Sequence, residues 1–314
     1  MKQKIINGYR FTLGQAFNFI ENSTDNELFE LADDLRKHYF GQRFDTCAIM
    51  NARSGKCTED CKWCAQSAYY KTSCAEFEMV ETEEAVVEAR KIRDSGVRMF
   101  SLVTSGRKLT PTNILKISQT FSVLNQEVPG IGYCASLGLQ SKEELQSLRE
   151  AGVSRYHCNI ETAPSFFDKL CTTHTIEEKV KTIRSAQETG MKICSGGIIG
   201  MGETERDRIE MAVFLQELGV DSIPVNILMP IKGTPLEGTT PLTDREILRA
   251  FAIFRIINPT AEVRFAAGRL RIRHIMKQAL ACGVTASLVG DMLTTVGSGI
   301  QEDIHFLKEN NYEI

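Results

Sequence analysis

The 314-residue sequence predicts an α/β protein, a (β/α)8 barrel of the TIM type with an N-terminal helical extension. From residue 45 onward, β-rich apolar runs alternate with capped amphipathic helices until eight runs have passed. The runs are apolar almost throughout, as expected for parallel strands that are covered on both faces. No linker or change in composition interrupts the series. Eight such units are expected to close into one barrel.

The strands and helices can be placed from the same pattern. The expected strands lie at about residues 45–51, 97–103, 131–137, 153–160, 191–198, 221–228, 262–266 and 284–289. Capping signatures predict helix starts at Thr82, Ser141, Thr175, Thr204 and Thr243. Glycines that can end a helix in the left-handed conformation come directly before strands at Gly96, Gly152, Gly190, Gly219 and Gly283.

Residues 1–44 are expected to form the extension, and residues 45–314 the barrel domain. Thr24 and Glu27 have the spacing of a capping box, and the residues after them place apolar side chains on one helical face. Because that face needs a partner, the helix is expected to pack on the barrel.

Charge and hydropathy exclude two classes of partner. The 37 basic and 40 acidic residues are nearly balanced, so nucleic acid is not expected as a ligand. No apolar run approaches the roughly 20 residues that would span a bilayer, so no membrane association is expected. The chain is therefore expected to be cytoplasmic, where its ten cysteines would be reduced thiols or metal ligands.

Three of these cysteines lie within eight residues, at Cys57, Cys61 and Cys64. A structural metal site usually fills all its positions with protein ligands, whereas three thiolates leave one iron of a 4Fe-4S cluster free for another ligand. The alternatives are a three-cysteine zinc site completed by a distant histidine, or a chance grouping of thiols. The spacing, with Trp63 before the third cysteine, resembles the signature of radical S-adenosylmethionine (radical SAM) enzymes. That resemblance implies that the free iron binds the amino acid end of SAM and that Trp63 lies against the adenine.

Polar and sulfur-containing residues gather at the ends of the predicted strands, where a barrel of this type carries its chemistry. Cys134 and Cys194 end two strands, and Arg264 lies on a third. A cysteine in an apolar run is commonly a small buried side chain, but two thiolates and a guanidinium facing one lumen would need a metal or an anion. The glycine-rich run 196–203 could let a nucleoside or amino acid approach the backbone, or it could be only a tight turn.

Together these stretches resemble biotin synthase over about residues 40–300. The matching stretches are residues 57–66, 156–162, 194–203, 224–226, 232–236, 263–264 and 268–269. The resemblance implies a sulfurtransferase that cleaves SAM to a 5′-deoxyadenosyl radical and inserts sulfur into dethiobiotin. It also implies an electron donor such as flavodoxin or ferredoxin, and an auxiliary iron-sulfur cluster as the source of the sulfur.

Residue by residue, the resemblance assigns roles to both ends of the predicted site. For SAM it implies contacts from Trp63, Glu161, Lys179, Gly196, Gly197, Ile198 and Glu203, with Glu161 in place of the family's ribose-binding aspartate and Lys179 in place of its usual arginine. For the substrate it implies that Asn159 and Asn226 contact the ureido ring and that Thr294 and Thr295 receive the carboxylate. His157 replaces another asparagine of the family.

The sequence departs from the family at the auxiliary cluster, which is usually a 2Fe-2S cluster held by three cysteines and an arginine. Cys134, Cys194 and Arg264 match this set, but the cysteine of the second strand is replaced by Ser101. Cys158 is the preferred candidate for the missing thiolate, although strand alternation places it opposite Asn159. Cys282 is the second choice, and Cys47, Cys74 and Cys171 are interpreted as core or surface thiols. The auxiliary cluster is therefore expected to have an unusual ligand set or nuclearity.

Two other functions stay open at this point. One is another radical SAM barrel enzyme of the same branch, such as a hydrogenase-cofactor maturase or a methylornithine-forming mutase, which the missing second-strand cysteine favours. The other is a scaffold that carries iron-sulfur clusters without radical chemistry. A homodimer is a mild expectation, since the outer helices of barrels often form such interfaces.

Overall fold

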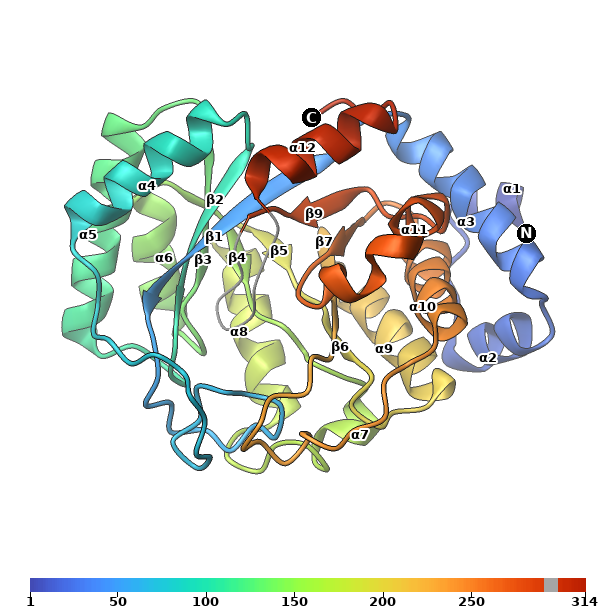
Figure 1. The fold of residues 1–314 in the computed structure, drawn as a ribbon, viewed down its shortest axis with the longest axis horizontal. Helices are drawn as coiled ribbons and strands as arrows, with labels where there is room; N and C mark the ends of the chain where they lie inside the picture. The colour runs from blue at the N-terminus through green and yellow to red at the C-terminus, as the bar shows by residue number, and fades with distance from the viewer. Residues whose placement is uncertain (291–298) are drawn as a thin grey trace.

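The computed structural model describes residues 1–290 and 299–314, and within them a closed parallel barrel forms the centre of the molecule (Figure 1). The β-segments follow one another in the order β5-β4-β3-β2-β1-β9-β8-β7-β6, and a further pairing of β5 with β7 closes the sheet. All pairings between these segments are parallel. The predicted barrel is confirmed.

The segments match the eight predicted strands, with one interruption. They are β1 Asp45–Arg53, β2 Met99–Thr104, β3 Gly132–Ser136, β4 Val153–His157, β5 Lys192–Cys194, β6 Gly197–Ile199, β7 Ser222–Ile227, β8 Glu262–Phe265 and β9 Ala286–Leu288. The expected strand 191–198 is divided into β5 and β6 at Ser195 and Gly196. There the β7 backbone comes so close that a Cβ on Gly196 would lie 2.1 Å from the Pro224 carbonyl oxygen.

The helices cover the outside of the barrel. Those between strands are α4 Thr82–Asp94, α5 Pro111–Glu127, α6 Lys142–Glu150, α7 Pro164–Phe167, α8 Ile176–Glu188, α9 Glu205–Leu218, α10 Asp244–Ile257, η1 Arg269–Ile275 and α11 Met276–Ala281. After β9, α12 spans Ile300–Glu309. The predicted caps at Ser141, Thr175, Thr204 and Thr243 are confirmed, each accepting a bond from the backbone N–H three residues later.

One predicted cap is shifted by a residue. Helix α4 begins at Thr82, but Glu81 is its N-cap, and the Glu84 carboxylate accepts the Glu81 N–H at 3.4 Å. The Thr82 hydroxyl is instead 2.8 Å from the Thr120 hydroxyl on α5. The Thr82 hydroxyl thus pairs with the neighbouring helix, while Glu81 and Glu84 cap α4.

Three helices precede the barrel: α1 Lys2–Ile6, α2 Leu13–Glu21 and α3 Asp25–Phe40. Thr24 and Glu27 form the predicted capping box at the start of α3. Helix α3 packs against α10, and α2 packs against α9, so these helices lie on the barrel's outer wall at one side of the molecule (Figure 1). None of the helices in the described part of the chain combines the length and apolar character needed to cross a membrane.

Candidate active site

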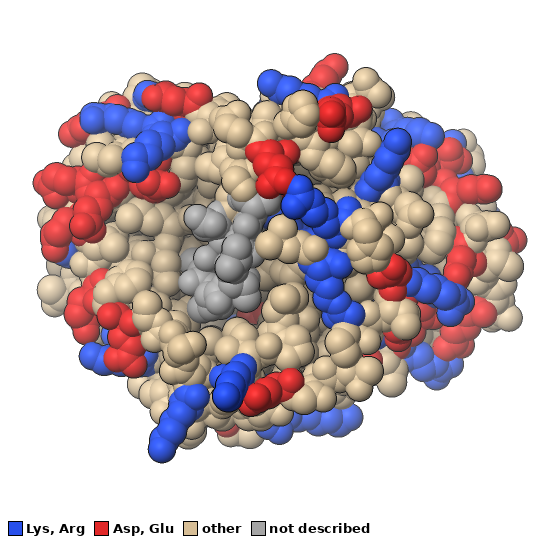
Figure 2. Space-filling model, viewed as in Figure 1, with Lys and Arg blue, Asp and Glu red and all other residues tan. Residues whose placement is uncertain are grey.

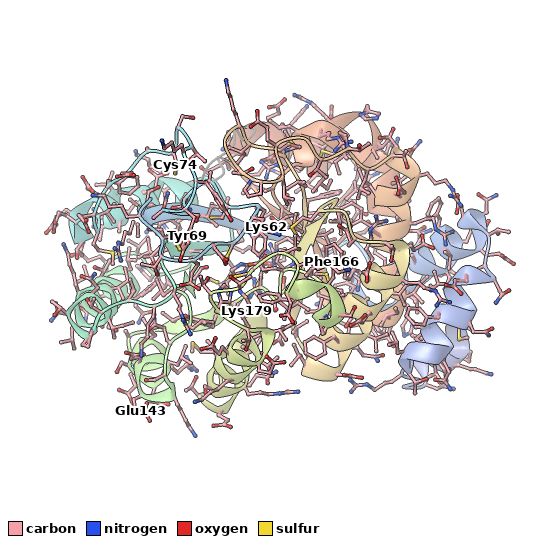
Figure 3. The ribbon with its side chains drawn as sticks, turned by 90° about the horizontal axis from the view of Figure 1, so that it is seen from below. Lys62, Tyr69, Cys74, Glu143, Phe166 and Lys179 are labelled. Atoms are coloured by element: carbon pink, nitrogen blue, oxygen red, sulfur yellow. The ribbon has the colours of Figure 1, made fainter. Side chains whose placement is uncertain are left out.

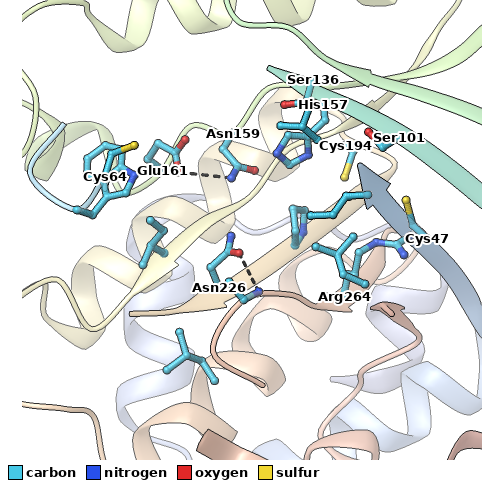
Figure 4. A pocket seen from close by; sticks show the side chains of 18 of the residues that line it. Cys47, Cys64, Ser101, Ser136, His157, Asn159, Glu161, Cys194, Asn226 and Arg264 are labelled. Atoms are coloured by element: carbon cyan, nitrogen blue, oxygen red, sulfur yellow. Dashed lines mark hydrogen bonds between the residues drawn. The ribbon is translucent and has the colours of Figure 1, made fainter. Parts of the chain in front are cut away.

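A cavity of about 280 Å³ lies in the barrel lumen and is lined by side chains from the strands and from the loops at their carboxyl ends. Figure 4 shows its order: Cys64 and Glu161 lie at one end, and Asn159 and Asn226 lie in the middle. At the far end, called here the deep end, Figure 4 shows Cys47, Ser101, His157, Cys194 and Arg264. Cys134 and Arg155 also line the cavity and neighbour these residues. Residues that the sequence spreads over more than 200 positions thus face one space.

The loop between β1 and α4 carries Cys57, Cys61 and Cys64, and its backbone is held in place at both ends. Cys57 donates its N–H to the Gln66 carbonyl at 2.9 Å, and the Cys57 carbonyl accepts the Ala68 N–H at 2.8 Å. The Asp60 carboxylate accepts the N–H of Thr172 at 2.8 Å, which ties the loop to the segment after α7. Figure 3 shows Lys62 and Tyr69 of this loop and Phe166 of α7 at this end of the barrel.

The sulfur atoms of the three motif cysteines are too far apart to bind one metal ion together, whereas a cluster of several irons could bind all three. Among the described residues, Cys57, Cys61 and Cys64 do not form a group whose sulfur atoms all lie within 4.8 Å of one another. One tetrahedral zinc ion, with Zn–S bonds of about 2.3 Å, needs thiolates roughly 4 Å apart. The separation therefore favours a multi-iron cluster over the three-cysteine zinc alternative.

The thiols of the motif are held in the protonated form by the apo protein. Burial raises the pKa of Cys57, and burial raises the pKa of Cys64 to about 11. The hydrogen bond with Cys171, followed by burial, raises the pKa of Cys61 well above its usual value. Since metals bind the thiolate, cluster loading must displace these protons.

The structure adds two neighbours that sequence reasoning did not place in the site. Cys171 Sγ lies 3.6 Å from Cys61 Sγ, and His174 Nδ1 lies 3.3 Å from Cys171 Sγ and 2.6 Å from a Glu59 carboxylate oxygen. Cys61, Cys171 and His174 form a group compact enough for a single metal ion. Only one of the motif cysteines belongs to it. No local pattern predicts this contact, because the partners are more than 100 residues apart.

Glu161 lines the cavity at the end near Cys64, and Lys179, which is not among the lining residues, pairs with it from behind this wall. Lys179 Nζ lies 3.8 Å from Glu161 Oε1, and both side chains are largely buried. Burial opposes the charged form of Lys179, but the Glu161 carboxylate and nearby thiols raise its pKa above the usual value. Lys179 therefore keeps its positive charge beside Glu161. Glu161 has a left-handed backbone with φ of 72°.

The glycine-rich turn is built on close backbone contacts. A Cβ on Gly197 would lie 2.2 Å from the Glu161 carbonyl oxygen, so only glycine lets β6 approach that residue. Ile198 lines the cavity. Glu203 does not line it: its carboxylate is buried and accepts the N–H groups of Gly200 and Met201, each at 2.7 Å. Glu203 thus stabilises the backbone of the turn without contacting the cavity.

Asn159 and Asn226 face each other across the middle of the cavity (Figure 4). Asn159 Oδ1 accepts the Gly196 N–H at 3.0 Å, and Asn226 Nδ2 donates to the Gly197 carbonyl at 3.0 Å. Each amide therefore uses one of its groups to hold the β5–β6 interruption. The Asn226 Oδ1 atom also accepts the Ala267 N–H at 3.1 Å.

The deep end holds the predicted Cys134 and Cys194, with Ser101 beside Cys134 in the strand register. Burial, followed by the nearby Cys47 and Cys194 thiols, raises the pKa of Cys134. For Cys194, burial also raises the pKa, but the imidazolium of His157 and the nearby arginines outweigh it and lower the pKa to about 7. His157 lies on the neighbouring strand β4 and is the register partner of Cys194.

Arg264 is buried at the floor of the deep end, and all three of its guanidinium nitrogens have protein partners. Nε donates to Ser222 Oγ at 3.2 Å, Nη1 to the Ser287 carbonyl at 3.1 Å, and Nη2 to the Asp45 carboxylate. Arg155 also donates to Asp45, at 3.1 Å. The Asp45 carboxylate thus lies between two guanidinium groups that line the deep end.

The preferred candidate for the third thiolate is not among the cavity's lining residues. Cys158 packs in the hydrophobic core, and its charged neighbours are Lys179 and Glu161 rather than the deep-end arginines. Regular strand alternation continues to Cys158 and turns its side chain outward. Cys282 is also a core residue outside the lining. Cys47, interpreted from the sequence as a core or surface thiol, does line the cavity.

Two predicted residues, Thr294 and Thr295, lie outside the described part of the chain. On the face drawn in Figure 2, acidic and basic side chains are interspersed, and neither sign forms a continuous patch over the described surface.

Comparisons with known proteins match the whole chain. A family model described as the Radical SAM superfamily matches residues 52–215, and one described as the Biotin and Thiamin Synthesis associated domain matches residues 224–313. Relatives named biotin synthase from Parabacteroides distasonis and Porphyromonas gingivalis are both 46% identical, over 100% of this chain and 96% and 95% of theirs. Another, from Clostridium botulinum, is 44% identical over 100% of this chain and 98% of its own.

Solved structures support the fold. Methylornithine synthase superposes with a TM-score of 0.83 at 19% identity, covering 99% of this chain and 96% of that one. The FeFe-hydrogenase maturase HydG from Carboxydothermus hydrogenoformans also superposes with a TM-score of 0.83, at 18% identity. The match covers 99% of this chain and 77% of the maturase chain. At such identities the likeness establishes the barrel and does not distinguish between activities.

Proposed function

The chain belongs to the biotin synthase family of the radical SAM superfamily, and from this premise we propose that it is a sulfurtransferase that forms biotin from dethiobiotin. The observation that carries the proposal is the order of groups along one cavity: the radical SAM motif, then two amides, then buried thiols. A carbon radical attacks the nearest C–H bond, so the substrate must lie between the radical and the sulfur donor.

Cys57, Cys61 and Cys64 would hold a 4Fe-4S cluster, which supplies the electron that cleaves SAM to methionine and a 5′-deoxyadenosyl radical. The chain's own residues bind and orient SAM. Trp63 offers its ring to the adenine, and Glu161 can accept hydrogen bonds from the ribose hydroxyls. Lys179 does not line the cavity, but it pairs with Glu161 at 3.8 Å and would bring a positive charge toward the methionyl carboxylate.

The glycine-rich turn supports this pocket from one side. Gly196 and Gly197 leave room for the Pro224 and Glu161 backbones, which brings the turn close to the pocket, and Ile198 supplies an apolar contact from the lining. Glu203 acts through the turn, because its carboxylate holds the N–H groups of Gly200 and Met201.

Dethiobiotin would occupy the middle of the cavity. Asn159 and Asn226 are matched to its ureido ring, which has both N–H donors and a carbonyl acceptor. His157 lies between these amides and the deep-end thiols and can offer a further polar contact. Thr294 and Thr295 are proposed to receive the substrate carboxylate.

Cys134 and Cys194 would help to hold an auxiliary iron-sulfur cluster, whose sulfide supplies the inserted atom. The fit rests on their donor chemistry, on the positive charge of Arg155 and Arg264 beneath them, and on a buried Arg155 Nε that has no hydrogen-bond partner among the described residues. The walls of the deep end are buried, which excludes water from the reacting carbon. Two C–H bonds are broken and two C–S bonds formed, so two SAM molecules are consumed.

The reaction also needs an electron donor, for which flavodoxin or ferredoxin is proposed. A cytoplasmic location agrees with ten cysteines that form no disulfide.

A homodimer is proposed on the general ground that outer barrel helices often form such interfaces. Chromatographic mass measurement of the anaerobic protein tests the dimer.

The activity is tested by mixing anaerobically reconstituted protein with dethiobiotin, SAM and a reductant, and measuring biotin and 5′-deoxyadenosine by mass spectrometry. Biotin formation is expected for the wild type and is expected to be absent for Cys61→Ala. Cleavage of SAM without biotin would contradict the proposed substrate, and no SAM cleavage by the reconstituted protein would contradict the radical mechanism.

A further inference from the structure

Three thiols, and not two, face the deep end of the cavity. Cys47 on β1, Cys134 on β3 and Cys194 at the end of β5 all line it, and each is at most 6% exposed. They interact electrostatically with one another: Cys134 with Cys47 and Cys194, and Cys47 with Cys194. Figure 4 shows Cys47, Ser101, Cys194 and Arg264 gathered at this end.

The position of Cys47 follows from the strand register. Ile49 is the partner of Ser101, and Cys47 lies two residues earlier on β1, opposite Met99. Since side chains alternate along a strand, Cys47 and Ile49 point to the same side, and both line the lumen. Strand β2 has no thiol at Ser101, but the neighbouring strand β1 has one at Cys47. Cys47 lies two residues further toward the amino end of the barrel than the position opposite Ser101.

The other spare cysteines do not offer a thiol to this space. Cys158 packs in the hydrophobic core, and Cys282 packs there near Asp33. Cys171 lies 3.6 Å from Cys61 at the opposite end of the site. Cys74 lies on the cluster loop, with its sulfur 3.7 Å from Ser54 Oγ.

The charges and spacing at the deep end fit a group with several metal ions. Three thiolates and Asp45 would bring four negative charges against three positive groups, the guanidinium groups of Arg155 and Arg264 and the His157 imidazolium, and such a buried excess needs cations. Within the described chain, the three sulfur atoms do not form a group that lies entirely within 4.8 Å. That spacing is too wide for one tetrahedral ion, which needs thiolates roughly 4 Å apart.

The arginines are arranged to compensate charge and not to ligate iron. Every guanidinium nitrogen of Arg264 is bonded to Ser222, Ser287 or Asp45. Arg155 Nε is buried without a partner in the described part of the chain and belongs to a side chain that lines the cavity, so it can donate to a sulfur atom held there.

We propose that Cys47, Cys134 and Cys194 are the three thiolate ligands of the auxiliary iron-sulfur cluster, with Cys47 replacing a second-strand cysteine. This inference rests on the proposed function. His157 lies in strand register with Cys194, and Ser101 lies in strand register with Cys134.

The test compares reconstituted wild-type protein with Cys47→Ala and Cys47→Ser, and with Cys158→Ala as the matched buried control. Iron and acid-labile sulfide are counted per chain, and Mössbauer and EPR spectra separate the two clusters. Both Cys47 variants are expected to lose the auxiliary signals and fall to about four irons per chain, the content of one 4Fe-4S cluster. Cys158→Ala is expected to keep the wild-type counts.

A fourth protein, the double variant Cys47→Ser/Ser101→Cys, returns the thiol to β2 and is expected to regain auxiliary iron. The SAM-cluster spectrum serves as the folding control, since a misfolded chain would lose that signal too. Full iron in both Cys47 variants, or iron lost in Cys158→Ala alone, overturns the inference and leaves the proposed function standing. A wild-type protein that takes up only one cluster overturns both.

Discussion

At the scale of single residues, the SAM end of the site depends on an unusual conformation. Glu161 is a non-glycine residue in the left-handed region, which costs on the order of 1 kcal/mol and is retained where surrounding contacts enforce it. Its N–H donates to the Gly196 carbonyl at 3.1 Å, and its carbonyl accepts the Ile198 N–H at 2.8 Å. These two bonds, on either side of Gly197, aim the carboxylate at the cavity.

Replacing Glu161 by glutamine keeps the shape of the side chain but removes its charge. Because hydrogen bonds to charged groups contribute about 1.5–3 kcal/mol, the dissociation constant for SAM is expected to rise by roughly tenfold or more. Anaerobic titration calorimetry with SAM measures it. Glu177→Gln, an exposed change on the nearby helix α8, is the matched control. If Glu161→Gln binds SAM as tightly as the wild type, the proposed contact between Glu161 and the ribose is wrong.

Gly197 shows how little room the glycine-rich turn leaves. In Gly197→Ala the new methyl group would meet the Glu161 carbonyl and the end of Met211, so overpacking is expected to cost about 1–3 kcal/mol of stability. SAM binding should weaken as well, since Glu161 must move. Thermal unfolding and the same SAM titration check both effects. Gly238→Ala, where nothing lies within 4 Å of the new Cβ, should leave both unchanged.

At the scale of elements, an ion-pair network fastens the N-terminal helices to the barrel wall. Asp25, the first residue of α3, pairs with Arg245 and Arg249 of α10 at 2.5 and 2.6 Å, and Arg249 also pairs with Glu205 of α9. The apolar face of α3, with Leu28, Ala32 and Leu35, is buried beneath it. Apolar burial stabilises the contact, and the ion pairs select its orientation.

The network predicts a pH-dependent effect of Asp25→Asn. The hydrogen bond from Arg245 holds the pKa of Asp25 below its ordinary value of 3.8. The stabilisation is therefore present above about pH 3.8 and is lost as the pH falls through the lower folded-state pKa. At pH 7 the variant is expected to unfold roughly 1–3 °C below wild type.

Thermal unfolding of the cluster-free protein between pH 7 and pH 3 measures this difference. The gap should narrow as the pH falls below 3.8, because protonation of the wild-type carboxyl removes the charge that the arginines bind. Asp34→Asn removes a more exposed pair with Lys2 and should show no such gap. A gap that persists unchanged at pH 3 would mean that Asp25 acts other than by its charge.

At the scale of the whole molecule, Arg255 joins parts of the fold that meet only when the barrel is complete. Its guanidinium is fully buried and donates to the carbonyls of Gly283 at 2.8 Å, Pro259 at 3.0 Å and Ala261 at 2.7 Å, and to Thr285 Oγ1 at 2.9 Å. It also lies over the Phe40 ring at the end of α3. One side chain thus connects α10, the approach to β9 and the N-terminal extension.

Arg255→Met would leave those acceptors buried without donors. Each unsatisfied group costs about 1–3 kcal/mol, so the free energy of unfolding is expected to fall by at least about 3 kcal/mol. Denaturant unfolding followed by circular dichroism measures it, with Arg273→Met on the exposed surface as the control. A loss below about 1 kcal/mol would mean that water replaces the missing donors.

Much of this molecule could be predicted from local sequence. The barrel follows from repeated strand and helix signals, and Cys57, Cys61 and Cys64 are found together because they are neighbours in the chain. Asn159, Asn226 and Arg264 were predicted at one end of the barrel because the strands are parallel, and all three line the cavity. These features need only the direction and order of the strands.

The sequence by itself determined the fold class, the cluster motif and the family resemblance, since each depends on patterns within short stretches. Only the tertiary structure decided that Cys47 faces the deep end while Cys158 packs outward, and that Cys171 and His174 reach Cys61. The physical reason is that a side chain's direction depends on strand register and on how strands end. A shift of one residue in the strand register, or in the position where a strand ends, moves a thiol from the lumen face to the core face.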